Sequence, residues 1–581
     1  MLKRLFGCVR EYKKYAIYTL IFIVIEVIIE CLLPFIVANV ITALQAESGI
    51  EMGYIIKIGA VLILMALVSL TMGALAAMTS AKASAGFAKN LRHDIFENIQ
   101  TYSFENIDKF SSSSLVTRMT TDVANVQMSF MMLIRIAVRA PLMLVFSITM
   151  AFILGGKLAG SFVIIIPVLV CGLLLIAKNA MPAFRRVFKK YDKLNESIEE
   201  NVRGARVVKG FSREEYEKEK FGKATDDIQR DFTKAERIVS LNSPLMQFCV
   251  YFNMSFIMIV GAMLAIKSGS EERLGEMSAM LTYGIQILMT LMMLSMIYVM
   301  LTMSMESMKR IYEVLSEKTV LANPENPVFE VKDGSVEFKD VCLKYSSKAK
   351  KYALSDIDLR IESGMTVGII GGTGSSKSSL VQLIPRLYDV TEGSVKVGGI
   401  DVRNYDIETL RGSVAMVLQK NLLFSGTISE NLRWGNPGAT DEEIREACRL
   451  AQADDFVMSF PDGYETKIEQ GGTNVSGGQK QRLCIARALL KKPKILILDD
   501  STSAVDTKTD ALIREGFKEY IPETTKIIIA QRIASVSEAD LIIVMENGKI
   551  SDMGNHEQLL RTSDIYREVY EQQTNGGEDN E

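Results

Sequence analysis

Glycines, serines and one lysine gather in GGTGSSKSSL (Gly371–Leu380), directly after the β-rich run Val367–Ile370 and before a helical pattern. A strand, a glycine loop and a helix in this order point backbone N–H groups and a helix N-terminus at one place, where they can bind phosphate. We expect Lys377 to reach the β- and γ-phosphates of a nucleotide and Ser378 to bind Mg²⁺. The strict pattern has glycine where Ser376 stands, so the Cβ of this serine is expected to perturb the loop.

Two further segments carry groups that can act on the same phosphates. ILILDD (Ile495–Asp500) has the pattern of a buried parallel strand that ends in carboxylates, which suit Mg²⁺. VSGGQKQR (Val475–Arg482) is a glycine-rich turn that opens a helix, and such a turn can cap the γ-phosphate of a nucleotide held by another subunit. The phosphate loop alone is a moderate signal, whereas its being followed by VSGGQKQR and then by ILILDD makes a chance match very improbable.

The composition indicates a membrane part and a soluble part. The chain has 581 residues, 48% of them hydrophobic and 23% charged, which fits more than one domain. The net charge of −3 gives no sign of a nucleic-acid partner. The seven cysteines have no CxxC or other metal-ligand spacing, so we expect reduced packing residues rather than disulfides or a metal site.

Six apolar stretches in the first half are long enough to span a lipid bilayer, which takes about 20 residues. They lie at Tyr15–Val40, Tyr54–Met78, Met131–Leu154, Gly160–Ala180, Leu245–Ile266 and Met277–Met303. Five basic residues precede the first stretch, whereas the loop after it, Thr42–Gly53, holds two glutamates and no lysine or arginine. This bias predicts a multi-pass protein of the plasma membrane with both termini in the cytoplasm.

Two long polar segments with helical patterning, Thr79–Phe130 and Met181–Pro244, separate the spans, whereas the outer loops are short. As helical hairpins with about 25 residues per arm they would project about 35–40 Å into the cytoplasm. Their tips would lie around Ile107–Phe110 and Phe211–Glu215. The alternative is a pair of ordinary cytoplasmic loops.

The predicted fold is therefore an α-helical membrane domain followed by an α/β phosphate-loop domain. The membrane domain, with six transmembrane helices and two cytoplasmic stalk loops, covers residues 1–315, and a proline-containing linker covers residues 316–334. The nucleotide-binding domain covers residues 335–572. Residues 573–581 form an acidic tail that we expect to be disordered.

Charged residues inside the predicted spans need an explanation, because a charge at membrane depth is costly. Glu26 and Glu30 lie on one helical face, and they fit either cation or proton handling or a solvated or structural pair. Arg135 and Arg139 are expected near the cytoplasmic interface, with their guanidinium groups snorkelling to water.

The last span and its extension are rich in methionine, a flexible and polarizable side chain that suits ligands of varied shape. Ordinary lipid-facing or core packing explains the same residues equally well. The methionines are Met277, Met280, Met289, Met292, Met293, Met296, Met300, Met303, Met305 and Met308.

The chain closely resembles the ABC exporter family over nearly its whole length. It has six spans followed by one nucleotide-binding domain, which we call the cassette, and the three motifs stand in the family's order. The resemblance implies an ATP-hydrolysing transporter that uses ATP and Mg²⁺, with stalk tips that pass motion to the cassette. The residues implied to bind ATP on this chain are Tyr345 (in VCLKY, stacking on adenine), Gly371, Gly372, Thr373, Gly374, Ser375, Ser376, Lys377, Ser378 and Ser379.

The resemblance also implies roles in metal binding and between subunits. Ser378, Gln419 (in MVLQK) and Asp499 would hold Mg²⁺, and Gln419 would also couple to the stalk tips. Ser503–Asp506 (SAVD) matches a loop that communicates between the two ATP sites. The residues implied to contact ATP on the opposite subunit are Ser476, Gly477, Gly478 and Gln479.

Two positions depart from family members that hydrolyse ATP well. Such members have a glutamate after the Mg²⁺ aspartate as general base, whereas this chain has Asp500, which is one methylene shorter. A displacement of about 1 Å can lower a rate about 10²-fold. They also have a histidine that contacts the γ-phosphate after a later strand, here KIIIAQR, where this chain has Gln531. The two histidines of the chain, His93 and His556, lie elsewhere.

These departures favour one half of a heterodimeric exporter that resembles the degenerate-site subunit of bacterial multidrug exporters. Its own site, with Asp500, Gln531 and Gln419 in the catalytic positions, would be slow. Its VSGGQKQR segment, the family's signature motif, would complete the active site of a second half-transporter. The predicted cargo is a small hydrophobic or amphipathic compound. The alternatives are a homodimeric lipid or peptide exporter that hydrolyses slowly through Asp500, and an ATP-gated channel or regulatory subunit. The fused halves argue against an importer.

Overall fold

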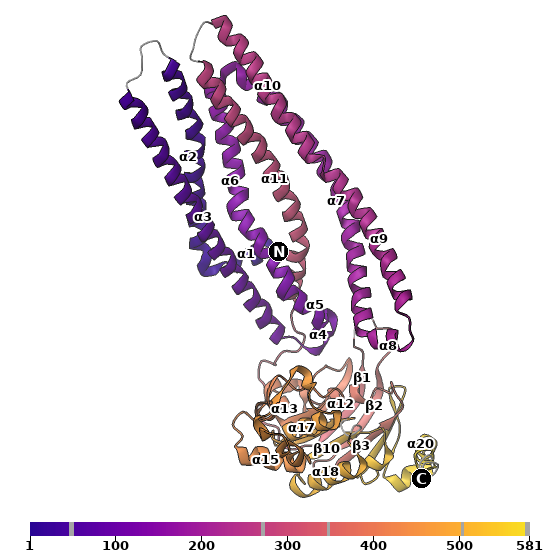
Figure 1. The fold of residues 1–581 in the computed structure, drawn as a ribbon. Helices are drawn as coiled ribbons and strands as arrows, with labels where there is room; N and C mark the ends of the chain where they lie inside the picture. Colours follow the sequence, from indigo (N-terminus) through magenta and orange to yellow (C-terminus); the bar gives the residue numbers. More distant parts are fainter. Residues whose placement is uncertain (46–51, 269–272, 346–348, 501–504, 576–581) are drawn as a thin grey trace. The chain divides into compact units, whose positions relative to one another are not determined.

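The computed structural model describes residues 1–45, 52–268, 273–345, 349–500 and 505–575. The chain forms two units (Figure 1). The helical unit contains Met1–Gln100 and Ser112–Glu317, and the cassette unit contains Thr101–Ser111 and Lys318–Glu581.

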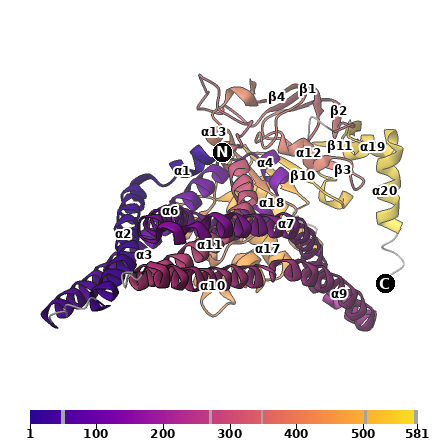
Figure 2. The ribbon, with the colours of Figure 1, turned by 90° about the horizontal axis from the view of Figure 1, so that it is seen from above.

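Within the described residues, six helices are long and apolar enough to cross a membrane, which confirms the predicted spans (Figures 1 and 2). The helices of this unit are α1 (Leu2–Gly7), η1 (Arg10–Tyr12), α2 (Lys13–Gln45), α3 (Met52–Gln100), α5 (Ser112–Thr117), η2 (Arg118–Asp122), α6 (Val123–Gly155), η3 (Gly156–Ala159), α7 (Gly160–Arg203), α8 (Ala205–Gly210), α9 (Glu214–Val239), α10 (Asn242–Ser268) and α11 (Arg273–Ser316).

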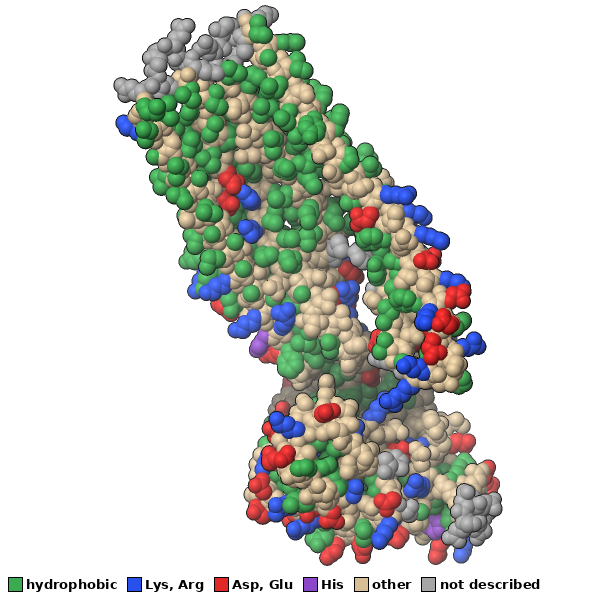
Figure 3. Space-filling view, viewed as in Figure 1, with side chains coloured by type: hydrophobic (Ala, Val, Ile, Leu, Met, Phe, Trp, Pro, Cys, Tyr) green, Lys and Arg blue, Asp and Glu red, His purple; other side chains and the backbone are tan. Residues whose placement is uncertain are grey.

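The stalks are continuations of the spans. α3 and α7 have 49 and 44 residues, so each is about 65–75 Å long and exceeds the thickness of a bilayer. α7 packs along α9, and Lys190 Nζ lies 2.8 Å from Asp231 Oδ2 between them. Figure 3 shows hydrophobic side chains over one end of the helical unit and charged side chains along the α7–α9 stalk. The short helix α8 between α7 and α9 has no buried residue, and Phe211 after it is 77% exposed.

Arg139, which we expected to extend to water, has carboxylate partners in the structure. Its Nη2 lies 2.8 and 2.7 Å from the two carboxylate oxygens of Glu30 and 3.5 Å from Glu26 Oε1. Two carboxylates on α2 lie beside this position of α6, and a charge pair in a medium of low dielectric is held strongly. Arg139 is therefore paired within the helical unit.

The methionines of α11 do not share one environment. Met277, Met280 and Met308 are buried, whereas Met289, Met292, Met293, Met296 and Met305 are exposed. Met300 is half-buried, and the side chain of Met303 lies outside the described part of the structure. Both the ligand-contact and the packing interpretation of these residues therefore stay open.

The cassette unit is built on a six-stranded sheet with the order β12-β11-β3-β10-β9-β6, which is parallel except for β12. β9 and β10 are buried at every position, which is why ILILD and TKIII read as continuous runs rather than as alternating patterns. The strands of this sheet are β3 (Thr366–Gly371), β6 (Val414–Val417), β9 (Ile495–Asp499), β10 (Thr525–Ile529), β11 (Leu541–Glu546) and β12 (Lys549–Gly554).

Two smaller sheets complete the unit. A four-stranded antiparallel sheet has the order β2-β1-β4-β5, and β7 pairs with β8. Their strands are β1 (Val336–Leu343), β2 (Leu354–Ile361), β4 (Glu392–Val397), β5 (Ile400–Asp401), β7 (Gly426–Thr427) and β8 (Lys467–Ile468).

Helices flank these sheets in the cassette unit. One of them, α4 (Phe104–Phe110), comes from the predicted tip of the first stalk and begins at a capping box of Ser103 and Asn106. The α-helices that follow in the chain are α12 (Lys377–Gln382), α13 (Ile407–Ser413), α14 (Ile428–Arg433), α15 (Asp441–Leu450), α16 (Asp454–Met458), α17 (Gly477–Leu489), α18 (Thr507–Tyr520), α19 (His556–Thr562) and α20 (Asp564–Asn575). The predicted linker joins the cassette from Lys318 onward, and Val328 forms a bridge to Tyr405. α20 continues past the predicted start of the tail at residue 573, and residues 576–581 lie outside the described part.

Candidate nucleotide site

The phosphate loop lies between β3 and α12, as predicted from its sequence pattern. A Cβ on Gly371 would lie 2.2 Å from the carbonyl oxygen of Met545, so only glycine fits there. Ser376 has φ +70° and ψ +25°, which is the left-handed region. This conformation costs a residue with a Cβ about 1–2 kcal/mol, which explains why the strict pattern has glycine at the position.

The loop holds the ammonium group of Lys377 by its own oxygens. Lys377 Nζ donates to the carbonyl oxygens of Gly371 at 2.8 Å and Gly372 at 2.9 Å, and to Ser375 Oγ at 3.3 Å. Burial lowers the pKa of Lys377, although the carboxylates of Asp499 and Asp500 oppose this effect. A partly desolvated cation at a helix N-terminus is a suitable phosphate-binding group.

Two of the three residues predicted to hold Mg²⁺, Ser378 and Asp499, meet near the carboxyl ends of β3 and β9. Ser378 Oγ donates to Asp499 Oδ1 at 3.0 Å, and Asp499 is 4% exposed. Burial raises the pKa of this carboxyl group, and the negative charge of Asp500 acts in the same direction. A hydroxyl and a carboxylate oxygen are hard ligands of the kind that Mg²⁺ prefers, so these two residues fit the ion.

The side chain of Asp500 is engaged by two glutamines. Gln531 Nε2 donates to Asp500 Oδ2 at 2.6 Å, and Gln419 Nε2 donates to the same oxygen at 3.4 Å. The backbone of Asp500 has φ +50°, and its N–H donates to the carbonyl oxygen of Ile529 at 3.0 Å. Because β10 lies between β3 and β9, the sheet places Gln531 and Asp500 side by side.

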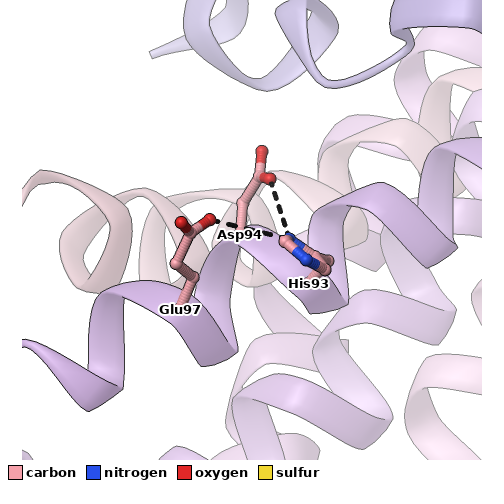
Figure 4. Close-up of side chains that lie close together, drawn as sticks. All are labelled: His93, Asp94 and Glu97. Atoms are coloured by element: carbon pink, nitrogen blue, oxygen red, sulfur yellow. Dashed lines mark ion pairs between the residues drawn. The ribbon is translucent and has the colours of Figure 1, made fainter.

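Both histidines of the chain contact residues other than Asp500, Gln531 and Gln419. His93 of α3 is an exposed side chain whose Nδ1 lies 3.8 Å from Asp94 Oδ1 and 3.6 Å from Glu97 Oε2 (Figure 4). His556 Nδ1 forms a hydrogen bond of 2.7 Å with the hydroxyl of Tyr566. Neither contact involves Asp500.

The signature turn has the geometry expected of a surface for phosphate. Ser476 is the N-cap of α17, its Oγ accepts the N–H of Gln479 at 3.3 Å, and Gln479 Oε1 accepts the N–H of Ser476 at 2.9 Å. Ser476 and Gly477 are exposed, while Val475 before them is buried in the cassette core. The turn is therefore built on a fixed helix end that faces solvent in this chain.

Comparison with known families matches both halves of the chain. The family model described as ABC transporter transmembrane region matches residues 16–306, and the one described as ABC transporter matches residues 354–503. The chain belongs to the ABC transporter family. It therefore combines a multi-pass membrane part with an ABC-type ATP-binding domain in one polypeptide.

Several ABC transporter proteins align with almost all of this chain. It is 34% identical over 567 residues to the uncharacterized ABC transporter ATP-binding protein YfiB of Bacillus subtilis, with 97% of each chain covered. It is 33% identical over 479 residues to a fatty acid ABC transporter ATP-binding/permease protein of Mycobacterium bovis, which covers 82% of this chain and 75% of that protein. A bacterial Atm1-family ABC exporter solved with ATP bound has the same fold, with a TM-score of 0.82 and 22% identity over 97% of this chain and 98% of that one.

The structure adds residues to this ABC cassette that the sequence motifs missed. Gln573 of α20 donates from Nε2 to the carbonyl oxygen of Gln531 at 2.8 Å and accepts the N–H of Ile533 at 2.8 Å. Gln481 Nε2 donates to the carbonyl oxygen of Asp500 at 3.4 Å. Gln573 lies in the predicted tail, so no local pattern could have linked it to β10.

The aromatic residue predicted to contact adenine also contacts the loop helix. The hydroxyl of Tyr345 lies 2.7 Å from Ser379 Oγ, and burial raises the pKa of this phenol. Its ring lies edge-on to that of Tyr388 with 5.0 Å between the centroids. The hydroxyl of Tyr388 donates to Asp108 Oδ2 of α4 at 2.8 Å, and burial and Asp108 raise its pKa. These contacts connect α4 to the phosphate-loop helix within the cassette unit.

The predicted loop Ser503–Asp506 is described only in part. Ser503 and Ala504 lie outside the described residues. Asp506 is the N-cap of α18 and accepts the N–H of Thr509 at 2.9 Å. The hydroxyl of Thr509 also donates to Asp506 Oδ2 at 2.7 Å, and this hydrogen bond, together with that of the N–H, lowers the pKa of Asp506.

Proposed function

We propose that this chain is the degenerate-site half of a heterodimeric ABC exporter of hydrophobic or amphipathic compounds. The observation that carries the proposal is the hydrogen bond of 2.6 Å from Gln531 to Asp500 Oδ2. A general base must reach the proton of an attacking water with a free oxygen. Asp500 is one methylene shorter than glutamate, and Gln531 and Gln419 both donate to the same oxygen.

In this site the residues would bind and orient rather than remove a proton. Lys377 and the loop N–H groups would hold the phosphates, and Ser378 and Asp499 would hold Mg²⁺ with Gln419 nearby. Bound Mg²⁺ neutralises phosphate charge. Gln531, in the place of a histidine, donates one amide proton to Asp500 Oδ2, so it orients the shorter carboxylate instead of contacting a phosphate.

The second ATP site would lie between this signature and a partner's phosphate loop. Ser476 and Gly477 are exposed at the N-terminus of α17, where a helix dipole and N–H groups favour an anion. The exposed Phe211 after α8 would be covered by the partner's cassette. These surfaces support a dimer, and the altered Asp500 and Gln531 support two unequal halves.

We place the protein in the plasma membrane with both termini in the cytoplasm, on the strength of the charge bias around the first span. We favour multidrug export, with small hydrophobic or amphipathic compounds as the cargo. A homodimeric lipid exporter is the second candidate, because one relative is named a fatty acid ABC transporter.

The test compares two amide substitutions in the same purified complex. Asp500→Asn in this chain should lower ATP turnover less than twofold, whereas replacing the partner's catalytic glutamate by glutamine should lower it about 10²-fold or more. Steady-state ATPase assays in lipid nanodiscs measure both. If Asp500→Asn stops turnover as completely as the partner's substitution, this site is catalytic and the proposal fails.

A binding control separates loss of hydrolysis from loss of ATP. Photo-labelling with an azido-ATP analogue should mark this chain in the Asp500→Asn complex as strongly as in the unaltered one. Lys377→Ala should remove the label, because it removes the ammonium group at the loop.

A further inference from the structure

A cavity of about 500 Å³ opens in the helical unit between α2, α6 and α11. Its wall is apolar around Pro34 of α2 and Met143 of α6. On the α11 side, Ser278, Thr282 and Gln286 follow one another at helical spacing and make the wall polar. The volume is in the range of sites that take drug-sized molecules.

Among the described residues that line this cavity, Glu30 alone is charged. It belongs to a group in which two carboxylates contact one guanidinium, since Arg139 also lies 3.5 Å from Glu26 Oε1. Glu26 is accommodated beside Gly73 of α3, where an added Cβ would lie 3.1 Å from the carboxylate. Arg135, one helical turn before Arg139, adds a more distant positive charge that acts on Glu26. Glu30 is therefore the charged side chain that lines the cavity, and it belongs to a group in which two carboxylates share the guanidinium of Arg139.

Gln286 offers a second polar contact in the same cavity. Its Oε1 accepts a hydrogen bond of 3.2 Å from Ser147 Oγ, and Ser147 is fully buried. In the part of the chain that the structure describes, Gln286 Nε2 has no acceptor. The amide is thus held by its oxygen, which leaves N–H groups for an acceptor or an aromatic face on a ligand.

We infer that this cavity binds an amphipathic organic cation, with its positive group beside Glu30 and its apolar body against Pro34 and Met143. The inference rests on the proposed export function and names the class of its cargo. A carboxylate at membrane depth attracts a cation strongly. A delocalised cation loses less hydration than a compact ammonium group when it leaves water, so it suits this apolar wall better.

Binding is measured directly on the transporter purified as the complex that it forms in its own membrane and placed in lipid nanodiscs. The probes are rhodamine 6G, a fluorescent amphipathic cation, Nile red, a neutral dye of similar size, and oleate, an anionic amphiphile. Glu30→Gln should raise the Kd of rhodamine 6G at least tenfold and change that of Nile red less than twofold. Thr282→Trp, which narrows the cavity, should weaken the binding of both dyes.

Two further variants serve as controls for the effect of Glu30→Gln. Glu30→Gln together with Arg139→Gln removes a charge pair without leaving Arg139 short of a partner, and it should also lose rhodamine 6G. Glu306→Gln replaces an exposed carboxylate at the other end of α11 and should bind all probes as the unaltered complex does. The inference is overturned if the double variant binds rhodamine 6G normally, or if the unaltered complex binds oleate and not the cation.

These binding assays need no ATP hydrolysis, so their failure is distinct from failure of the proposed function. Normal rhodamine 6G binding by the double variant would remove the cation site while the comparison of Asp500→Asn with the partner's substitution still stood. Loss of turnover in Asp500→Asn would remove the degenerate site while the cation site still stood.

Discussion

At the scale of single residues, the proposal depends on two side chains. Asp500 is one methylene shorter than the usual glutamate, and Gln531 has an amide in place of the imidazole of histidine. Asp500 places its carboxylate closer to the backbone than a glutamate would, and Gln531 occupies its Oδ2 at 2.6 Å. A histidine at residue 531 could donate to a phosphate, whereas the glutamine amide here donates to a neighbouring carboxylate. The two substitutions therefore act together, which is why both must be considered in any attempt to restore the site.

Ser376→Gly should stabilise the cassette and tighten ATP binding. The serine has φ +70°, a conformation that glycine adopts without the penalty of about 1–2 kcal/mol. Part of this gain is offset because glycine makes the unfolded chain more flexible, so we expect a net gain of about 0.5–1 kcal/mol. Thermal unfolding of the full-length protein and titration with a fluorescent ATP analogue measure the two effects.

Thr373→Gly is the matched control for this substitution. Thr373 is in the same loop and is not among the residues with positive φ, so glycine there should stabilise nothing. Equal stabilisation by both substitutions would show that the left-handed backbone of Ser376 carries no strain.

At the scale of elements, α4 is the part of the stalk that reaches the nucleotide site. Asp108, Tyr388, Tyr345 and Ser379 form a line of hydrogen-bonded and ring contacts from α4 to α12. Phe104 of α4 adds a ring contact to Tyr388 with 6.0 Å between the centroids. A movement of α4 would therefore displace the tyrosine that is expected to contact adenine.

Tyr388→Phe should weaken the response of ATP hydrolysis to substrate. The variant keeps both ring contacts and loses the hydrogen bond to Asp108, which is worth about 1 kcal/mol. A coupling loss of that size corresponds to about fivefold less stimulation. ATPase assays with and without a transported dye measure it, while ATP affinity should stay within twofold.

Tyr352→Phe is the control, because the hydroxyl of Tyr352 donates to Glu392 at 2.6 Å on the same unit without contacting α4. It should leave the stimulation unchanged. If both variants lower it equally, loss of any surface tyrosine hydroxyl explains the effect and α4 has no special role.

At the scale of the whole molecule, our proposal gives the chain one complete signature and one incomplete catalytic site. Any interface that it forms with itself would combine Asp500 and Gln531 with its own signature. Two such copies would give two slow sites, whereas a partner with glutamate and histidine would give one fast site.

The purified chain alone should therefore hydrolyse ATP about 10²-fold more slowly than the complex with its partner half. Adding the partner during reconstitution should restore turnover, which is measured by phosphate release in nanodiscs. Rapid hydrolysis by the chain alone would favour the homodimeric exporter instead.

Sequence alone was enough for the features that depend on local order. Strand, glycine loop and helix follow one another around residues 367–380, and a phosphate loop needs little more than that order. The six spans could be predicted equally well, because a run of about 20 apolar residues is typical of a membrane-spanning helix. The family could be predicted from these motifs. The same motifs predicted that Asp500 and Gln531 make this ATP site slow.

The tertiary structure decided which distant side chains meet. β10 lies between β3 and β9, so Gln531 reaches an aspartate 31 positions away, and Gln573 of α20 holds the backbone of Gln531 from 42 positions away. Arg139 is a similar case, since its place in one helix could be read from the sequence and its carboxylate partners on another helix could not. Periodicity and motifs record each residue's own neighbours along the chain. Hydrogen bonds and ion pairs depend on strand order and helix packing, which are settled only when the whole core is buried.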